Sequence, residues 1–279
     1  MQINNIPKTM HDTLPVFKCR ASCLGKIMTQ GRGSGITDKQ LEKIQELQDK
    51  PKLTEKQEDT LNELIAKRDA PPQLSATAKS YCITWVKEQV YAREQDFTSK
   101  YTDKGNACED EAIVYAGIDG KKNEQWYEND FITGTPDVVL SDTIIDIKNS
   151  WDCFTFPLFE NTIPTTDYEW QVRGYMWMLN RDKAEVTYTL MNTPTDIVEK
   201  EYWRATGMNP KGSETGILID AVFTPEFREF SKHYQYTDIE DRYRIKTYKF
   251  TRDKELEQQI RQRVELCRDF IKQLTQNHE

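Results

Sequence analysis

The sequence predicts an α/β fold in which a small mixed β-sheet is flanked by helices. Helix-periodic segments lie on both sides of several short apolar runs in the middle of the chain, and the last part of the chain has a strongly amphipathic helical pattern. This order of helices and strands is typical of an α/β fold. Of the 279 residues, 37% are hydrophobic and 30% are charged, which fits a folded globular protein and argues against wholesale disorder.

The first regular element that we expect is a helical hairpin over residues 37–69. Thr37 with Gln40, and Thr54 with Gln57, have the Thr-x-x-Gln spacing of a capping box. The surface of this segment is densely charged and its apolar stripe is narrow. We therefore favour an inserted, solvated hairpin over an element that binds a partner.

The remaining elements follow in alternation. Helices are expected over 75–93 and 103–116, and strand-like runs over 126–132, 136–140 and 143–147. A helix over 168–180 and strands over 185–191 and 244–250 come next, and the tail 253–274 is an amphipathic helix. Residues 193–243 are the least informative part, with a helical start and a loop at 210–216. We expect one domain over 1–279, with the hairpin as an insertion.

Composition excludes several classes of protein. No stretch approaches the ~20 apolar residues of a membrane helix, and the N-terminal sequence lacks the pattern of a secretory signal. Six cysteines are too few for a disulfide scaffold and lack the paired spacing of a zinc site. We therefore expect a cytoplasmic protein without a membrane partner, placed in the host cytoplasm if it is viral.

The charge of the chain is negative overall but uneven. A formal net charge of −8 argues against a protein that coats nucleic acid. Residues 242–272, however, hold ten basic and five acidic residues. This stretch could follow a phosphate backbone, and a solvated helix face explains it equally well. If it touches DNA, binding should weaken steeply with salt.

The most informative stretch is residues 134–150, which contains Gly-Thr-Pro-Asp and then Asp-Ile-Lys. On a strand, residues i and i+2 lie on one face, so Asp146 and Lys148 point the same way. If 136–140 pairs with 143–147 as an antiparallel hairpin, Asp137 lies beside Asp146 across the ladder. The sequence thus predicts two carboxylates and one ammonium group close together.

Such a group has a specific chemistry. Two adjacent carboxylates repel unless a cation or a proton joins them, and hard oxygen ligands suit Mg²⁺ or Mn²⁺ better than Zn²⁺. A metal there can activate water and stabilise a phosphate, while the lysine orients or deprotonates the water or neutralises the oxyanion. The pattern therefore indicates metal-dependent phosphodiester hydrolysis, although a charged strand edge without chemistry would look the same.

Two further features favour the catalytic interpretation. Glu109 lies on a helix that precedes the sheet, and Gln171 lies on the helix that follows it, with Tyr175 one turn later on the same face. The order Gly-x-x-x-Glu, Gly-x-Pro-Asp, Asp-x-Lys and Gln-x-x-x-Tyr resembles the PD-(D/E)XK nuclease superfamily. Within it, the sequence is most similar to the lambda-exonuclease or YqaJ-type, RecB-like viral nucleases, over about residues 100–192.

The resemblance implies a restriction-endonuclease-like core and a role for each matching residue. Asp137 and Asp146 would bind Mg²⁺, or Mn²⁺, together with the carbonyl of Ile147, and Glu109 would add a ligand directly or through water. Lys148 would act on the attacking water. Gln171 would orient water or the scissile phosphate, and Tyr175 would support its helix or contact DNA. Position 146 is Asp where the family more often has Glu.

The family also implies how DNA is bound. The segment 19–26 resembles an entry segment in which Arg20, Ser22 and Lys26 would bind the 5′-phosphate of the resected strand. Lambda-type relatives work as ring-shaped trimers on duplex DNA ends, beside a single-strand annealing protein. Related nucleases with an iron–sulfur cluster need three clustered late cysteines, and the late region offers only Cys267, so no cluster is expected.

The sequence therefore predicts a Mg²⁺-dependent deoxyribonuclease, in the first place a 5′-to-3′ exonuclease of double-stranded DNA that resects ends for phage-type recombination. A single-strand exonuclease or a structure-specific endonuclease would use the same chemistry. A non-catalytic protein that binds DNA ends is the third hypothesis, and the intact set of Glu109, Asp137, Asp146 and Lys148 argues against it.

Overall fold

The computed structural model describes residues 10–29, 36–70, 72–95, 98–207 and 224–276. The chain divides into two compact units. The first unit comprises 1–19, 23–94 and 258–279, and the second comprises 20–22 and 95–257. The loop expected at 210–216 lies outside the described residues. In the part that the structure describes, no helix is long and apolar enough to cross a membrane.

The first unit is helical. Its elements are α1 (Met10–Thr13), α2 (Leu24–Met28), α3 (Asp38–Gln48), α4 (Glu55–Asp69), α5 (Ala76–Tyr91) and most of α10 (Lys254–Gln276). The apolar stripe predicted for the tail is buried, with Ile260, Val264, Cys267 and Ile271 all at most 3% exposed. Phe17 joins this core, and its ring packs edge-on against Trp85 of α5 at 5.1 Å. The helical periodicity of the tail is therefore confirmed.

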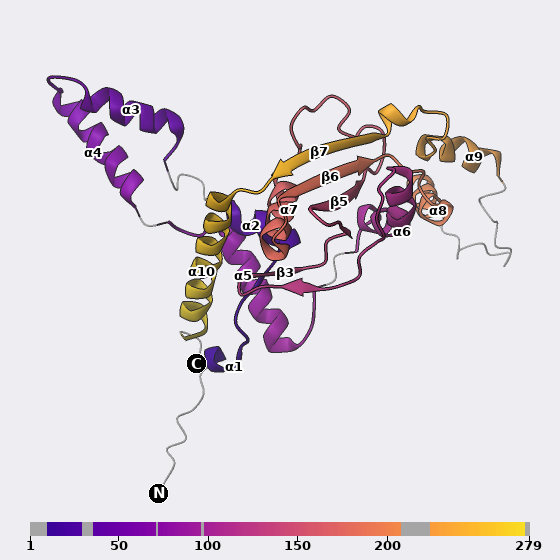
Figure 1. Ribbon diagram of the computed structural model, residues 1–279, viewed down its shortest axis with the longest axis horizontal. Coiled ribbons are helices and arrows are strands. Elements are labelled where there is room, and N and C mark those ends of the chain that lie inside the picture. The colour runs from indigo at the N-terminus through magenta and orange to yellow at the C-terminus, as the bar shows by residue number, and fades with distance from the viewer. Residues whose placement is uncertain (1–9, 30–35, 71, 96–97, 208–223, 277–279) are drawn as a thin grey trace, which may run out of the picture. The chain divides into compact units, whose positions relative to one another are not determined.

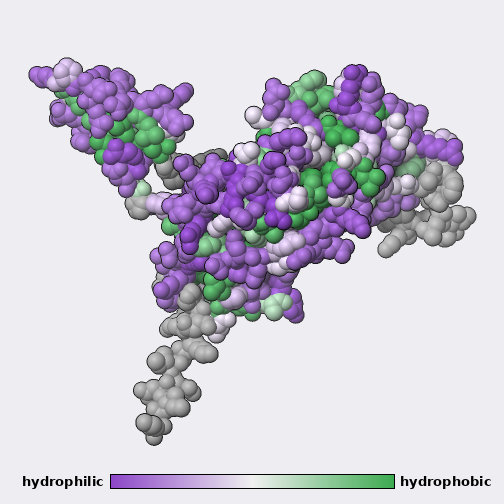
Figure 2. Space-filling model, viewed as in Figure 1, coloured by the Kyte–Doolittle hydropathy of each residue, from purple (hydrophilic) through white to green (hydrophobic). Residues whose placement is uncertain are grey.

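The predicted hairpin is formed by α3 and α4, and both predicted capping boxes are present. The backbone N–H of Thr37 donates to the side chain of Gln40, and the N–H of Thr54 donates to that of Gln57, each at 3.1 Å. Ile44 and Leu47 are buried on α3, whereas no residue of α4 is. Figure 2 accordingly shows a mostly hydrophilic hairpin with apolar atoms along the line between its helices.

The second unit is built on a four-stranded mixed sheet, as the sequence predicts. Its strands are β4 (Val138–Val139), β5 (Thr143–Asn149), β6 (Lys183–Thr189) and β7 (Ile245–Thr251), in the order β4-β5-β6-β7. Strands β5 and β6 are parallel, and the other two pairs are antiparallel. Figure 1 shows β5, β6 and β7 side by side. The short strands β2 (Tyr127–Glu128) and β3 (Ile132–Gly134) pair antiparallel in a second sheet, where β3 also adjoins β1 (Cys19–Arg20).

Helices cover both faces of the four-stranded sheet. The helices of this unit are α6 (Lys100–Tyr115), α7 (Thr166–Leu179), α8 (Thr195–Thr206) and α9 (Pro225–Ser231). Ile145 and Ile147 of β5 form a core cluster with Ala112 and Ile113 of α6. Asp146, which points to the opposite face, meets α7. The α/β class with a small mixed sheet between helices is confirmed.

Several predicted boundaries shift for local reasons. The helix expected over 103–116 begins at Lys100, because the side chain of Ser99 caps it and accepts from the N–H of Thr102. The run expected over 126–132 is broken, because the side chain of Asn129 accepts from the N–H groups of Phe131 and Ile132 and makes a turn.

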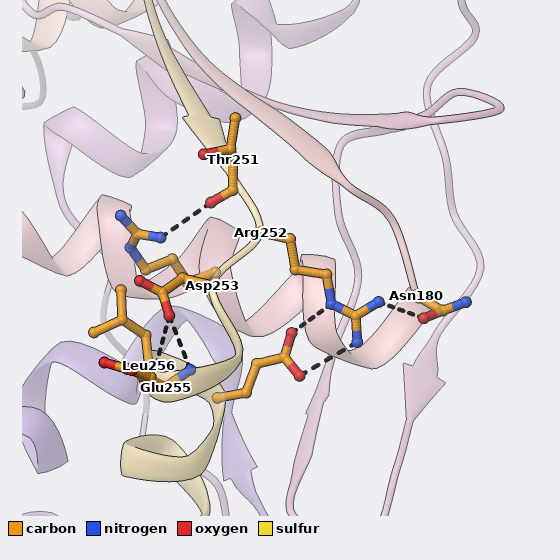
Figure 3. Close-up of polar contacts among 8 residues, drawn as sticks. Asn180, Thr251, Arg252, Asp253, Glu255 and Leu256 are labelled. Carbon is orange, nitrogen blue, oxygen red and sulfur yellow. Dashed lines mark hydrogen bonds and ion pairs between the residues drawn. The ribbon is translucent and has the colours of Figure 1, made fainter.

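The chain passes from β7 into α10 through a network around Arg252 (Figure 3). The guanidinium of Arg252 pairs with Glu257 at 2.5 Å and donates to the side chain of Asn180. Asp253 caps the helix by accepting from the N–H of Glu255 at 2.8 Å. Asn180 has a positive φ of 51° at the end of α7. The network therefore joins the end of α7 to the start of α10.

Candidate active site

The structure forms the hairpin that the motif predicts. Val138 lies opposite Ile145 in the antiparallel ladder of β4 and β5, so Asp137 precedes the ladder at the position opposite Asp146. Asp137 Oδ2 accepts a hydrogen bond of 2.7 Å from the backbone N–H of Ile147. This bond fixes the Asp137 carboxylate against the strand that carries the other two residues of the motif.

Asp146 is the most deeply placed of these groups, and its side chain is fully buried. Its Oδ2 lies 2.7 Å from Lys148 Nζ, and its Oδ1 accepts a hydrogen bond of 2.9 Å from Gln171 Nε2 on α7. The ammonium group of Lys148 also lies 4.5 Å from the centre of the Tyr168 ring. The structure therefore brings Asp137, Asp146, Lys148 and Gln171 together.

The electrostatics of the pair differ from those of ordinary surface carboxylates. Burial, and next the nearby Asp146 carboxylate, raise the pKa of Asp137 to about 8, although Lys148 and the N–H of Ile147 act against this. For Lys148, burial lowers the pKa, but the two aspartates outweigh it and the net pKa is raised. One buried and one half-buried carboxylate beside a single ammonium group leave an excess of negative charge, which a cation or a proton must balance.

Tyr175 of α7 and Gly134 of β3 hold this helix against the smaller sheet. The hydroxyl of Tyr175 donates to the carbonyl of Thr135 at 3.1 Å and accepts from Gln171 Nε2 at 3.2 Å, and the side chain is 3% exposed. A Cβ atom at Gly134 would come within 2.9 Å of the Tyr175 ring. The glycine of the Gly-x-Pro-Asp motif is thus a packing requirement, and these contacts favour the supporting role for Tyr175.

Glu109 lies on α6 and lines the same cavity as Asp137. Its side chain is 19% exposed, and the ammonium group of Lys122 lies 3.4 Å from its Oε2. Sequence reasoning did not find Lys122, because a lysine in a short polar loop carries no local signal of its partner. Glu109 contributes to the negative field at Asp137 and raises the pKa of that carboxyl, after burial and Asp146.

A cavity of about 600 Å³ opens beside these groups. Glu109, Asp137 and Lys148 line it, and Asp146 and Gln171 lie behind its wall. Much of the remaining wall is aromatic and was not predicted, with Tyr101, Trp151, Tyr168 and Tyr188. Helix α6, strand β5 and the chain that leads into α7 all contribute, so only the tertiary fold forms the cavity.

The predicted 5′-phosphate ligands belong to different compact units, although they are close together in the sequence. Arg20 and Ser22 are exposed and belong to the second unit, whereas Lys26 belongs to the first. The ammonium group of Lys26 lies 5.6 Å from the centre of the Tyr81 ring. A joint role for the three residues stays a prediction.

Part of the basic stretch 242–272 serves the fold. Arg244 is buried and donates to the carbonyl of Leu190 at 3.1 Å. Within the first unit, Arg263 donates to the carbonyl of Gln73 and Arg268 to that of Phe17, each at 3.0 Å. Together with Arg252, these residues bond to groups of the protein itself, which weakens the argument for a continuous DNA track.

The carboxylates of Asp137 and Asp146 are oxygen donors of the kind that a hard divalent cation prefers, but they do not form a complete ligand shell. Among the described residues, no group of three or more His, Cys, Asp and Glu side chains is placed so that it could hold a metal ion. The mutually repelling carboxylates of Asp137 and Asp146 are the two oxygen donors that the structure brings together. All six cysteines are free, and Cys153 is exposed.

The whole structure is similar to those of known exonucleases. A phage-related exonuclease from Haemophilus somnus 129PT matches with 27% sequence identity and a TM-score of 0.58, over 97% of this chain and all of that one. The alkaline exonuclease LHK-Exo from Laribacter hongkongensis shares the fold, with 11% identity and a TM-score of 0.51, over 94% of this chain and 91% of that one. No family model and no curated protein matches the sequence.

These matches confirm the resemblance that the motifs indicate. The chain is similar to a phage-related exonuclease, which agrees with its resemblance to the lambda-exonuclease or YqaJ group of PD-(D/E)XK nucleases. The neighbours support a nuclease, and therefore a hydrolase.

Proposed function

We propose that the protein is a metal-dependent DNA exonuclease that hydrolyses phosphodiester bonds. Its specific activity would be the resection of double-stranded DNA ends from 5′ to 3′. The observation that carries the proposal is the half-buried Asp137 beside the buried Asp146, which contacts Lys148, at a cavity of about 600 Å³. A purely structural site would rarely retain two such carboxylates beside one lysine, because their repulsion destabilises the fold.

Asp137 and Asp146, with the carbonyl of Ile147, would hold Mg²⁺ or Mn²⁺, and Glu109 would add a ligand through water. The metal would lower the pKa of a bound water and stabilise negative charge on the phosphate. Lys148 keeps its positive charge beside the cavity, where it can orient the attacking water or neutralise the developing oxyanion. Gln171 fixes the Asp146 carboxylate, and Tyr175 fixes Gln171.

The direction of digestion and the partners are the finer parts of the proposal. Arg20, Ser22 and Lys26 would bind a 5′-phosphate and so select the strand that enters the site. A ring-shaped homotrimer around duplex DNA and a single-strand annealing protein as partner follow from the resemblance. Size-exclusion chromatography with light scattering tests the ring, and a strict monomer would contradict processive digestion.

The central experiment uses a linear duplex labelled at either end, with and without a 5′-phosphate, in Mg²⁺, Mn²⁺ or EDTA. We expect nucleotide release in either metal, none in EDTA, and loss of activity in Asp146→Ala with the fold retained. Asp142→Ala is the matched control, because Asp142 lies on the same hairpin but is exposed and pairs with Lys183. Release that persists in EDTA would refute the metal mechanism.

The same assay separates the other hypotheses. A single-strand exonuclease degrades only denatured DNA, and a structure-specific endonuclease also cuts a nick-free circular plasmid, which an exonuclease leaves intact. A protein that binds DNA ends without turnover shows no release even in Mn²⁺.

A further inference from the structure

A loop of the second unit carries two phenylalanine rings that are almost completely exposed. In the chain between β5 and α7, Phe154 is 92% and Phe159 is 87% exposed. Apolar rings of this size are usually covered in a folded protein, and neighbouring exposed ones indicate a surface that binds something.

The first ring is presented by a tight turn. The side chain of Asp152 accepts from the N–H of Phe154 at 3.1 Å and from that of Thr155 at 2.9 Å. Trp151 and Phe156, on either side of the turn, are each 6% exposed and anchor it in the protein. The exposure of Phe154 therefore results from a defined backbone conformation.

The second ring is presented by contacts to the sheet. Lys246 Nζ donates to the carbonyl of Leu158 at 3.1 Å, and the hydroxyl of Tyr248 donates to the carbonyl of Glu160 at 2.9 Å. Both donors lie on β7, so the backbone on each side of Phe159 is tied to the same strand. Lys246 thus places a positive charge at the residue before Phe159, while the Glu160 side chain accepts from the N–H of Phe159 at 3.0 Å.

The loop is continuous with the active-site cavity. Trp151, Thr155 and Pro164 line the cavity together with Asp137 and Lys148. Neither ring lines this cavity, and Phe154 lines a second hollow with Leu158 and Tyr236. The loop thus lies at the edge of the cavity, where the nucleotides that adjoin a phosphate at Lys148 could reach it.

We propose that Phe154 and Phe159 stack on unpaired bases of the DNA strand whose backbone enters the cavity. This inference rests on the proposed exonuclease function and adds the substrate contact that positions the strand. Phenylalanine has no hydrogen-bonding group, so it cannot read one base in preference to another, whereas every base has a face on which a ring can stack. An exonuclease that removes successive nucleotides needs this tolerance, and the ammonium groups of Lys148 and Lys246 are suited to the accompanying phosphates.

The test measures binding in EDTA to a duplex with a short single-stranded end that contains 2-aminopurine, followed by cleavage in Mg²⁺. For Phe154→Ala and Phe159→Ala we expect the Kd to rise about tenfold each, with loss of the stacking-induced fluorescence quenching. The slope of log Kd against log salt should stay unchanged, because no phosphate contact is lost. At saturating DNA, kcat should stay within about twofold of the wild type.

Matched variants make the test specific. Phe154→Trp and Phe159→Trp should keep the affinity, whereas Phe154→Leu and Phe159→Leu should lose it as alanine does, because leucine has no ring to stack. Val114→Ala is the control for an exposed apolar residue, since Val114 is 78% exposed on α6 and does not line the cavity. On a duplex whose single-stranded end is abasic, the alanine variants and the wild type should bind equally.

The inference is overturned if the alanine variants have a Kd within twofold of the wild type, or if they lose as much affinity for the abasic end as for the normal one. In that case, DNA cleavage by the wild type would still support the proposed function. A wild-type protein that neither binds nor cuts DNA overturns both. Thermal melting of each variant shows whether the fold is intact, and the high exposure of both rings predicts that it is.

Discussion

Strand β5 and the hairpin α3–α4 use charged residues in opposite ways. Residues 143–147 of β5 are all buried, and the strand carries Asp146 and Lys148 in direct contact. In the hairpin, charged side chains face solvent, as in the pair of Lys43 with Glu46, where they are 45% and 53% exposed. Exposed pairs contribute ~0–1 kcal/mol, whereas buried charges cost several kcal/mol when a partner is missing.

The difference shows which charges serve the fold and which serve chemistry. The hairpin needs its charges only for solubility and local helix stability, and its helices depend on two capping boxes and two buried side chains. Asp146 of β5 and the neighbouring Asp137 repel each other, which works against the fold and is the pattern expected of a functional site.

The largest effect is expected for Asp137→Asn. The amide keeps the shape of the side chain and can accept the hydrogen bond from Ile147, but it removes a metal ligand, so we expect activity to fall by about 10³-fold or more. Without metal, the variant should be at least as stable as the wild type in a denaturant titration, because a buried repulsion is gone. A clear loss of stability would show that the Asp137 charge serves the fold.

The second effect compares two lysines. Lys148→Met should lower kcat by about 10²–10⁴-fold and lower the free energy of unfolding by roughly 2–4 kcal/mol, because it leaves Asp146 buried without its ammonium partner. Lys43→Met, which removes a surface pair in the hairpin, should cost less than about 1 kcal/mol. Equal losses in the two variants would contradict the distinction between the regions.

Gln171→Ala tests the layer behind the cavity. Gln171 does not line the cavity but holds Asp146 at 2.9 Å, so its loss should reduce activity by about 10–100-fold, less than the loss of a carboxylate itself. The effect should appear as a weaker apparent affinity for Mg²⁺ in metal titrations of the rate. Unchanged metal dependence would remove Gln171 from the site.

The last prediction concerns stability alone and a buried cation without a carboxylate hydrogen-bond partner in the described part of the chain. Lys104 of α6 is buried and donates to the carbonyl of Trp151 at 2.9 Å, and burial lowers its pKa to about 8, although Cys108 and Asp152 act against this and Arg244 adds to it. The unfolded chain binds the proton of Lys104 more tightly than the folded chain does. The free energy of unfolding should therefore rise with pH between about 8 and 10.4.

The measurement is the free energy of unfolding of the wild type minus that of Lys104→Met, followed from pH 7 to 10.5. The difference should move in favour of the wild type by about 3 kcal/mol over this window. Subtracting the value of the variant cancels the pH dependence that other titratable groups contribute to the free energy of unfolding. A flat difference would mean that Lys104 keeps an ordinary pKa in the fold.

Short-range sequence patterns determined several helices and one strand register of this protein. The capping boxes at Thr37 and Thr54, the periodicity of the tail helix and the register that sets Asp137 opposite Asp146 were all readable from the sequence, because each depends on residues only a few positions apart. The Gly-x-Pro-Asp and Asp-x-Lys motifs likewise predicted the hairpin of β4 and β5.

Only the tertiary structure decided the rest. The bond from Gln171 to Asp146, the pairing of Lys122 with Glu109 and the network around Arg252 join residues that lie far apart along the chain or on different elements. The aromatic wall of the cavity and the outward turn of Phe154 and Phe159 depend in the same way on how β7, α6 and α7 pack around β5. Local patterns specify which face of an element is apolar, but they do not specify which other element covers it, and that choice places these side chains.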